Sequence, residues 1–493
     1  MDNYSKLELT GLPNSFFELN RSKFFRLAKE KLINTNKIDE DSILALKGGV
    51  DIPKYDTDIS YYYFYQEANF YYISGVREPG LDLIIDFKSN KVILFYNQPD
   101  ESTKYWQTVL TKQDIYEKYS LEVIDKNEFN SWINIRDPKE IYSLTGINDT
   151  SKKGLHSFEF NFINEFSHLN LKIKENDIIY YVIKDCRKVK SNEEINLYYF
   201  ISKATNEAHK EMIKALGSKH SKYKNTKSID NYKSNIEYER DIENIFNNYL
   251  AENYYTRIWG YPCISGCGEN SATLHYSNNN KKLIDGELLL IDMGMRFCNY
   301  VSDVTITLPI SGKFSKEQKE IYNIVLNCNR KVMDLVKEGV TFSYLNKLSK
   351  LLIIEGLQEL DFISKEKTAS ELFDLQIYKY FYPHSLGHYI GIEVHDVYYF
   401  DREKYFNIDS DVLLENNIIT IEPGIYFRDF LLDKAFKNND INYLLNTNKI
   451  KENFNFGGVR IEDNVIVKKD GYVNLNKDLP RTVEEIEKYM KLN

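Results

Sequence analysis

The chain has 493 residues, of which 42% are hydrophobic, so it is long enough to bury the cores of two or three domains, and we expect two. Acidic side chains outnumber basic ones by 73 to 64, and a formal net charge of -9 excludes a general electrostatic attraction to nucleic acids or anionic membranes. No stretch approaches the roughly 18 apolar residues of a membrane-spanning helix, and the first residues lack the pattern of a secretory signal. The composition therefore predicts a soluble, cytoplasmic protein.

The N-terminal part predicts a mixed α/β domain. Residues 14–32, NSFFELNRSKFFRLAKEKL, place apolar side chains at helical spacing. The run SILAL at residues 42–46 is typical of a short strand, and in residues 81–96 two apolar runs flank the polar turn KSNK, which predicts a hairpin. We assign residues 1–182 to this domain.

A second domain is predicted over residues 183–493. A helix begins after Ser191, an N-cap that forms a capping box with Glu194, and a second capping box at Ser315 starts another helix. These helices alternate with apolar runs of strand type, which predicts a helix-backed sheet and places the whole chain in the α/β (α+β) class. The polar residues 217–235 are interpreted as a solvated surface insertion.

The five cysteines are few for this length and odd in number, which argues against a disulfide framework. Cys263 and Cys267 stand close together but lack the second pair that would complete a zinc site. We expect reduced thiols that fill core space.

Four carboxylates interrupt apolar, strand-like runs: Asp292, Asp303, Glu422 and Glu462. Neighbouring strands lie about 4.8 Å apart, so Asp292 and Asp303, on the two arms of a predicted hairpin, can share a cation. Any one of these acids alone is better explained by the solvent-exposed face of its strand, but burying several without counter-charge is costly. Asp463, next to Glu462, falls on the opposite strand face by alternation and is expected to be dispensable.

Three of the eight histidines fall in the segment FYPHSLGHYIGIEVHD, residues 381–396. His384 and His388 have the i, i+4 spacing of a helical zinc site, but Ser385 replaces the glutamate expected there and the glycines favour a non-helical segment. Carboxylates with one imidazole suit manganese, cobalt, zinc or iron(II), and carboxylates can bridge two ions about 3.5 to 4 Å apart. The acids and the histidines together therefore predict a two-metal site.

These motifs resemble those of the pita-bread metallopeptidases, which include methionine aminopeptidase, aminopeptidase P and prolidase. They occur in the expected order: LHYS, LLLIDMGMRFCNYVSDVTITLP, PHSLGHYIGIEVHDV, IEPGIYF and GGVRIEDNVIV. Within that family the chain resembles the eukaryotic-type prolidases, or Xaa-Pro dipeptidases, over nearly its whole length. The resemblance implies an N-terminal creatinase/prolidase-like domain, a C-terminal pita-bread domain and a homodimer.

The resemblance also implies which residues bind metal. Asp292 is similar to the chelating ligand of one ion, and Asp303 and Glu462 are similar to the two bridges. His388 and Glu422 are similar to ligands of the other ion, and Glu422 is in addition placed to act as the general base.

The remaining histidines are assigned outside the ligand set. His275, His384 and His395 resemble the outer imidazoles that hold the scissile carbonyl, stabilise the tetrahedral intermediate and pass protons. His275 alone would be better explained as a hydrogen-bonded core histidine. Tyr261 and Thr305 match positions that orient metal ligands.

One position departs from the prolidase pattern. Prolidases of this type carry an arginine between the HD and EPG motifs that holds the substrate's C-terminal carboxylate, and Ile408 stands at that position. Arg402, or Lys404, is the predicted replacement from another angle, and Arg460 matches the family's second substrate arginine. Strict preference for dipeptides is therefore left open.

The predicted activity is hydrolysis of Xaa-Pro dipeptides by a site that binds two divalent metal ions. Manganese is the favoured metal. Aminopeptidase P is the nearest alternative, because it shares all five ligands but removes the residue ahead of proline from longer peptides. A non-enzymatic pita-bread binding protein is the alternative from a different class, and the complete ligand set argues against it.

Overall fold

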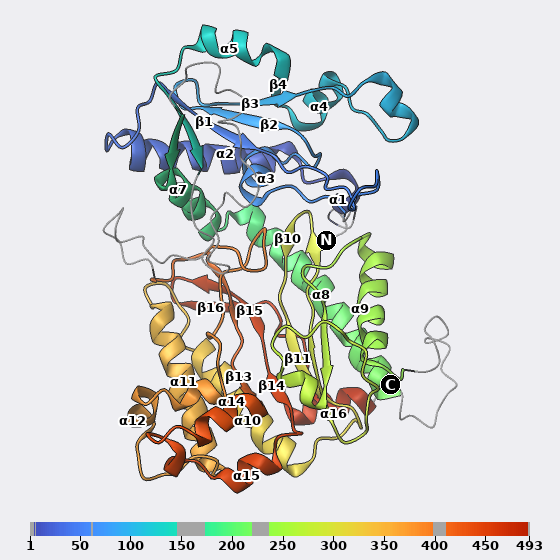
Figure 1. The fold of residues 1–493 in the computed structure, drawn as a ribbon, viewed down its shortest axis with the longest axis vertical. Coiled ribbons are helices and arrows are strands. Elements are labelled where there is room, and N and C mark those ends of the chain that lie inside the picture. The colour runs from blue at the N-terminus through green and yellow to red at the C-terminus, as the bar shows by residue number, and fades with distance from the viewer. Residues whose placement is uncertain are drawn as a thin grey trace. The chain divides into compact units, whose positions relative to one another are not determined.

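The computed structural model describes residues 4, 6–60, 63–144, 173–218, 236–397 and 411–491 (Figure 1). The chain divides into an N-terminal unit and a C-terminal unit. The N-terminal unit comprises Thr10–Ser191 and Val397–Ser410, and the C-terminal unit comprises Met1–Leu9, Asn192–Asp396 and Asp411–Asn493. Arg402 and most of the predicted surface insertion (219–235) lie outside the described residues.

The predicted boundary between residues 182 and 183 falls within helix α7 (Asp177–Lys188), whereas the two units separate after Ser191. The N-terminal unit holds this helix through a salt bridge between Lys31 and Asp185, whose Nζ and Oδ2 atoms lie 2.6 Å apart. The assignment of residues 1–182 and 183–493 as the two domains stays a prediction.

The N-terminal unit is built on one six-stranded sheet. In sheet order its strands are β4 (Glu122–Asp125), β3 (Lys91–Tyr96), β2 (Asp82–Asp86), β1 (Ser42–Lys47), β5 (Glu140–Leu144) and β6 (Ile173–Asn176). The predicted hairpin is confirmed as β2 and β3, which pair antiparallel with Asp86 opposite Lys91. The predicted strand is β1, and the predicted helix is α2 (Asn14–Ala28), which continues as a π-helical turn over Lys29–Ile33.

Short helices accompany this sheet: α3 (Ala68–Ser74), α4 (Lys112–Tyr119) and α5 (Phe129–Arg136). Helix α1 (Leu7–Thr10) belongs for most of its length to the C-terminal unit. Apolar side chains of α5 pack on the sheet, with the rings of Phe129 and Trp132 lying 5.2 Å and 5.4 Å from that of Phe95. Helix α5 thus covers one face of the sheet, and strands β1, β2 and β3 are buried along nearly their whole length.

The C-terminal unit contains two three-stranded sheets and two strand pairs among its described residues. The first sheet is β11 (Thr305–Pro309), β8 (Leu288–Asp292) and β7 (Ile264–Cys267), and the second is β12 (Ile418–Ile421), β15 (Asp463–Lys468) and β16 (Gly471–Asn474). The pairs are β9 (Arg296–Phe297) with β10 (Tyr300–Val301), and β13 (Gly424–Tyr426) with β14 (Gly458–Arg460). These strands form the helix-backed sheet structure that the sequence predicts.

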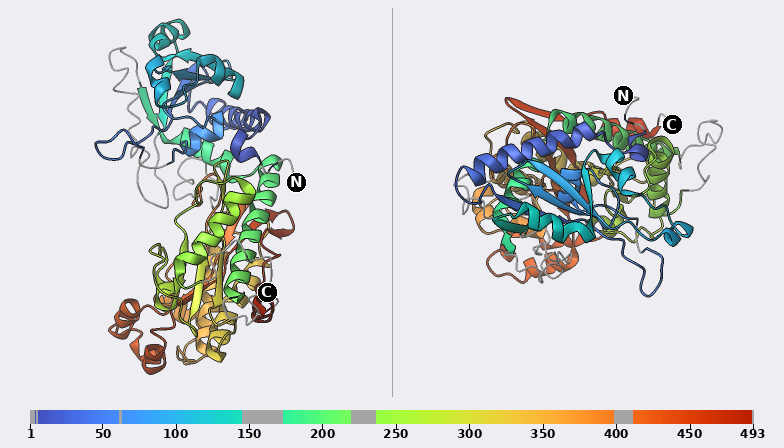
Figure 2. Two further views of the ribbon diagram at one scale, coloured as in Figure 1. Left: turned by 90° about the vertical axis from the view of Figure 1, so that its right-hand side faces the viewer. Right: turned by 90° about the horizontal axis from the view of Figure 1, so that it is seen from above.

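Two pairs of long helices flank these strands, α8 with α9 and α10 with α11 (Figure 1, Figure 2). The helices of the unit are α8 (Asn192–Ser218), α9 (Glu239–Tyr254), α10 (Lys316–Met333), α11 (Phe342–Glu359), α12 (Ala369–Asp374), α14 (Asp429–Phe436), α15 (Thr447–Glu452) and α16 (Val483–Lys491). The capping box predicted at the start of α10 is confirmed, because Ser315 Oγ accepts from Gln318 N and the Gln318 side chain accepts from Ser315 N.

The four predicted carboxylates lie at strand ends and not inside strands as expected. Asp292 ends β8, Asp303 precedes β11, Glu422 follows β12, and Glu462 lies between β14 and β15. The ladders break there because backbone N–H groups bond elsewhere: Glu422 N donates to Leu386 O at 2.8 Å, and Glu462 N donates to Thr305 O at 3.1 Å. The side chains of these carboxylates therefore need not follow the alternating orientation of side chains along a continuous strand.

The cysteines lie in the core, and the described helices lack a membrane-spanning segment. All five cysteines (Cys186, Cys263, Cys267, Cys298 and Cys328) are free and buried, which confirms the prediction of core thiols. Within the described part of the chain, no helix combines the length and the apolar content needed to cross a membrane.

Candidate metal centre and active site

Three predicted ligands come together in the C-terminal unit. Ligand atoms of Asp303, His388 and Glu462 all lie within 4.8 Å of one another. His388 Nε2 lies 3.3 Å from Asp303 Oδ2 and 3.5 Å from Glu422 Oε1, so a fourth predicted ligand borders the same space. Carboxylate oxygens and one imidazole at this spacing suit a hard or borderline divalent cation.

The backbone orients the ring of His388 for such a role. His388 Nδ1 lies 3.1 Å from Tyr389 O, and a carbonyl can only accept, so Nδ1 carries the proton in this hydrogen bond. The lone pair is then on Nε2, the atom that faces Asp303 and Glu422. Burial lowers the pKa of His388 to about 4, which keeps the ring neutral as metal coordination requires.

The carboxylates of the cluster are electrostatically unfavourable without a cation. Burial raises the pKa values of Asp303, Glu422 and Glu462 well above the usual range, and repulsion between neighbouring carboxylates raises them further. Asp303 Oδ1 is also buried and has no hydrogen-bond partner among the described residues. A divalent cation would relieve the repulsion and occupy this oxygen, so the residues fit the metal site that the sequence predicts.

Asp292 differs from the other carboxylates because both of its oxygens are occupied. Oδ1 accepts a hydrogen bond from the Tyr261 hydroxyl at 2.6 Å, and Oδ2 accepts one from Arg460 Nη2, also at 2.6 Å. Burial would raise the pKa of Asp292, but the charge of Arg460 and these hydrogen bonds outweigh burial and hold it below its usual value. Asp292 therefore stays ionised beside the cluster.

Arg460 connects this carboxylate to the rest of the site. Its Nε donates to Thr305 Oγ1 at 3.0 Å, and Thr305 Oγ1 in turn donates to Glu462 Oε2 at 2.7 Å. Its Nη1 donates to the Tyr426 hydroxyl at 3.0 Å. Arg460 is only 3% exposed, so its guanidinium serves the protein's own groups.

Sequence reasoning missed Tyr426, which links Arg460 to an outer histidine. The Tyr426 hydroxyl lies 2.8 Å from His384 Nε2, and its ring centroid is 5.4 Å from that of His384. A signal was present, because Tyr426 lies in the same short motif as Glu422, IEPGIYF, although the break at Pro423 prevents strand alternation from placing its side chain.

The three outer histidines lie near the cluster. His384 Nδ1 is 3.8 Å from Glu422 Oε2, and the ring centroid of His395 is 4.3 Å from that of His388. Burial, together with neighbouring positive groups, lowers the pKa values of His384 and His395 to about 3 each. His275 is exposed in a turn after the 3-10 segment Gly268–Ala272, so its interpretation as a core histidine is wrong.

Comparisons with known proteins agree with this geometry. The sequence profile of "Metallopeptidase family M24" matches residues 200–469, and that of "Aminopeptidase P, N-terminal domain" matches residues 17–142. The chain is 32% identical to the Xaa-Pro dipeptidase of Homo sapiens over 500 residues, which cover 98% of this chain and 94% of that protein. The chain belongs to metallopeptidase family M24.

Other relatives of this M24 peptidase point to the same family. It is 30% identical to the "Probable Xaa-Pro aminopeptidase PEPP" of Paracoccidioides brasiliensis over 86% of this chain and 87% of that protein. The structure of Pseudomonas aeruginosa aminopeptidase PepP matches with a TM-score of 0.76 at 24% identity, covering 98% of this chain and 99% of that one, and so shows the same fold. The mixed α/β class with an aminopeptidase P-type N-terminal domain and an M24 domain is confirmed, and the chain is a metal-dependent peptidase.

The segment around His384 and the loop that carries Arg402 differ in what the structure describes. The rival helical zinc site is wrong, because residues 384–388 are not helical. The predicted replacement arginine, Arg402, and Ile408 both lie outside the described residues. The recognition of a substrate carboxylate therefore stays a prediction.

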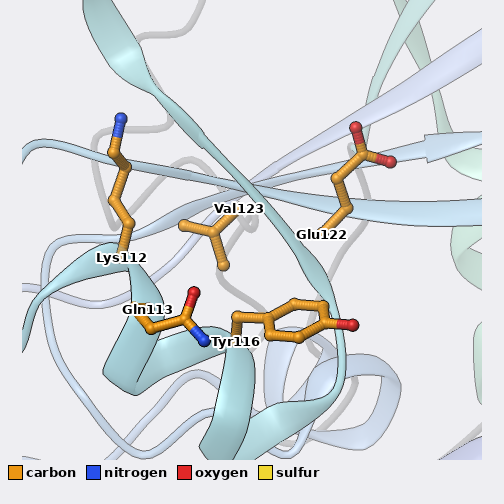
Figure 3. A pocket seen from close by; sticks show the side chains of 5 residues that line it. All are labelled: Lys112, Gln113, Tyr116, Glu122 and Val123. Atoms are coloured by element: carbon orange, nitrogen blue, oxygen red, sulfur yellow. The ribbon is translucent and has the colours of Figure 1, made fainter.

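A pocket of about 460 Å³ lies elsewhere in this M24 peptidase, between α4 and β4 of the N-terminal unit (Figure 3). Its lining side chains are Lys112, Gln113, Tyr116, Glu122 and Val123. Both charged groups have partners outside it, since Lys112 lies 3.8 Å from Asp125 and Glu122 lies 3.9 Å from Lys91. It contains none of the predicted catalytic residues, so we assign the chemistry to the carboxylate and histidine cluster.

Proposed function

We propose that this chain is an Xaa-Pro dipeptidase, which hydrolyses the bond before the proline of a dipeptide. The observation that carries the proposal is the cluster of Asp303, His388 and Glu462, with Glu422 beside it. It is supported by the 32% identity to a dipeptidase that aligns over 98% of this chain.

The proposed ligand set divides between two metal ions. Asp292 would hold one ion, His388 and Glu422 would hold the other, and Asp303 and Glu462 would contribute to both. When bound, two divalent ions lower the pKa of a water molecule and polarise the scissile carbonyl. We propose manganese as the metal to test first.

The protein's own groups then move the protons. Glu422, which contacts His388 through one oxygen and lies near His384 through the other, accepts the proton of the attacking water and transfers it to the leaving imino nitrogen. His395 is neutral, so it can donate an N–H to the substrate carbonyl as negative charge develops on it. The Nδ1 proton of neutral His384 is held by Ser385 O at 2.8 Å and its Nε2 lies 2.8 Å from the Tyr426 hydroxyl, so His384 is proposed to pass protons through Nε2. His275 is proposed to act from the exposed side of the site.

Recognition of the proline carboxylate requires a cationic side chain. The three nitrogens of Arg460 donate to Thr305, Tyr426 and Asp292. These contacts support a role in holding Asp292, and the proposed substrate contact of Arg460 would use its remaining donors. We propose that Arg402 supplies the principal contact.

Aminopeptidase P activity is the second candidate, favoured by the relative of that name and by Ile408 in place of an arginine. The test is hydrolysis of Gly-Pro and of Gly-Pro-Ala by the purified chain, with and without manganese(II). A dipeptidase cleaves Gly-Pro in a metal-dependent manner and cleaves Gly-Pro-Ala slowly. Equal rates on both peptides would move the assignment to aminopeptidase P.

The proposal includes a cytoplasmic homodimer, an expectation from the resemblance that sedimentation and cell fractionation would test.

A further inference from the structure

Helix α11 carries a buried cation beside the site. Lys350 is 7% exposed, and none of the salt bridges among the described residues involves it. Burial lowers the pKa of Lys350 to about 8. A buried ammonium without a carboxylate partner destabilises a fold, and an apolar residue of the same length would fill this space at a lower cost in free energy.

Two of the contacts of Lys350 lead to His384. Its Nζ donates to the backbone carbonyl of His384 at 2.9 Å. The same ammonium lies 4.7 Å and 4.6 Å from the ring centroids of Tyr378 and Tyr382, at cation–π distance. Tyr382 in turn meets the His384 ring edge to face, with centroids 4.8 Å apart. The cation therefore touches the histidine through both the backbone and an aromatic ring.

A second side chain of α11 holds the same segment. Asn346 stands one helical turn before Lys350, on the same helix face. Its Oδ1 accepts a hydrogen bond from Leu386 N at 2.9 Å. Residues 384–386 lie outside helices and strands, and besides the hydrogen bond from Glu422 N to Leu386 O these two side chains bind the segment on either side of Ser385.

We propose that Lys350 and Asn346 are positioning residues, a two-point clamp on α11 that fixes the backbone on either side of Ser385. The clamp thereby holds the His384 imidazole, which is hydrogen-bonded to Ser385 O and to the Tyr426 hydroxyl, in its place in the active site. This inference rests on the proposed function, in which His384 acts on the substrate. The clamp sets where the Cα of His384 lies, while Tyr426 holds the ring at Nε2. Displacing the segment by about 1 Å would be enough to lower the rate substantially, because catalytic hydrogen bonds depend steeply on geometry.

Lys350→Met tests the clamp, with Lys347→Met as the matched control. Lys347 lies on the same helix and also contacts an aromatic ring, that of Phe373 at 5.1 Å, but it is exposed whereas Lys350 is buried. In the manganese-loaded full chain, Lys350→Met should lower kcat for Gly-Pro roughly tenfold or more while KM stays within about twofold. Metal content should not change, and the melting temperature should not fall, since an uncompensated buried charge is removed. Lys347→Met should behave as wild type.

Substitutions of Asn346 test the clamp independently of Lys350. Asn346→Asp keeps the oxygen that accepts from Leu386 N and should keep wild-type kcat, whereas Asn346→Ala should lower it. This comparison decides the question even where Lys350→Met fails to fold.

A double-mutant cycle separates positioning from stability. If Lys350 acts through His384, adding Lys350→Met to His384→Ala should cause little further loss of kcat. Unchanged kcat in Lys350→Met, or full additivity with His384→Ala, would overturn the clamp. If His384→Ala itself keeps wild-type kcat, the proposed role of His384 fails and the clamp fails with it; a loss in His384→Ala with none in Lys350→Met would refute the clamp alone.

Discussion

Asp303 is the residue at which the need for a cation is clearest, because it combines a raised pKa with a buried oxygen that lacks a partner. Asp303→Asn, or Glu462→Gln, removes a bridging charge at nearly constant volume. We expect kcat to fall by more than about a hundredfold, since replacing even the outer partners of metal ligands lowers metal affinity or activity by 10- to 100-fold. At least one metal equivalent should be lost, as measured by elemental analysis of the purified variant.

The control for these variants is Asp470→Asn. Asp470 is exposed just beyond the end of β15 and should be replaceable without effect. Asp463, expected from strand alternation to be dispensable, is unsuitable, because it is 1% exposed and its Oδ1 lies 2.8 Å from Arg481 Nη2. Normal turnover by Asp303→Asn would contradict the proposed site.

Replacing His384 and replacing His388 should have opposite effects on the metal content of the protein. His388→Ala should lose metal and activity together. His384→Ala should keep its metal and lose roughly 10² or more in kcat, the scale of a positioned acid or base. Comparable metal loss in the two variants would show that His384 is a ligand.

Arg402→Ala addresses the departure from the prolidase pattern. If Arg402 binds the proline carboxylate, the variant should show a higher KM for Gly-Pro, corresponding to about 1.5 to 3 kcal/mol for a hydrogen bond to a charged group. Hydrolysis of the C-terminally amidated analogue should change little. An equal effect on both substrates would argue that Arg402 does not contact the carboxylate.

At the scale of elements, α8 packs on the strands through a buried histidine. His209 is fully buried, and its Nε2 lies 2.9 Å from Met293 O, next to the end of β8. Burial lowers the pKa of His209 from 6.5 to about 4. The imidazole is therefore neutral in the folded protein at pH values where it is protonated in the unfolded chain.

The sign of the resulting pH dependence follows from proton binding. Below the unfolded pKa the unfolded chain binds a proton that the folded chain excludes, so the stabilisation is complete above about pH 6.5 and is lost progressively down to about pH 4. Between about pH 7 and pH 5 this amounts to roughly 2 kcal/mol in the free energy of unfolding.

His209→Gln should reduce the pH dependence by about this amount, measured by urea unfolding at the two pH values. Other titrating groups are common to both proteins and cancel in the difference. Identical slopes for wild type and variant would show that His209 does not contribute.

For the whole molecule, every predicted ligand lies in the C-terminal unit. Removing metal with a chelator should therefore lower the unfolding temperature of that unit, because a ligand that binds only the folded state stabilises it by mass action. We expect a shift of roughly 5 °C or more in calorimetry, with full loss of activity and recovery on adding manganese. A chelator-induced shift confined to the N-terminal unit would contradict the site.

The sequence alone determined the elements that depend on local pattern. The hairpin of β2 and β3, the capping box of Ser315 and the identity of the carboxylates and histidines could all be predicted, because turn residues, caps and alternation act over a few positions. The family resemblance extended this to the roles of individual residues. The M24 membership that the comparisons show agrees with it.

Only the tertiary structure decided which partner each of these groups meets. Strand alternation predicted that Asp463 points away from the site, but it did not predict the salt bridge of Asp463 with Arg481. No local pattern indicated that Tyr261 and Arg460 hold Asp292 by hydrogen bonds. Likewise, nothing in the periodicity of α11 distinguishes a buried Lys350 under His384 from a solvated lysine. Burial and charge pairing arise when elements distant in sequence pack together, and residue patterns within one element do not specify the surface that it will meet.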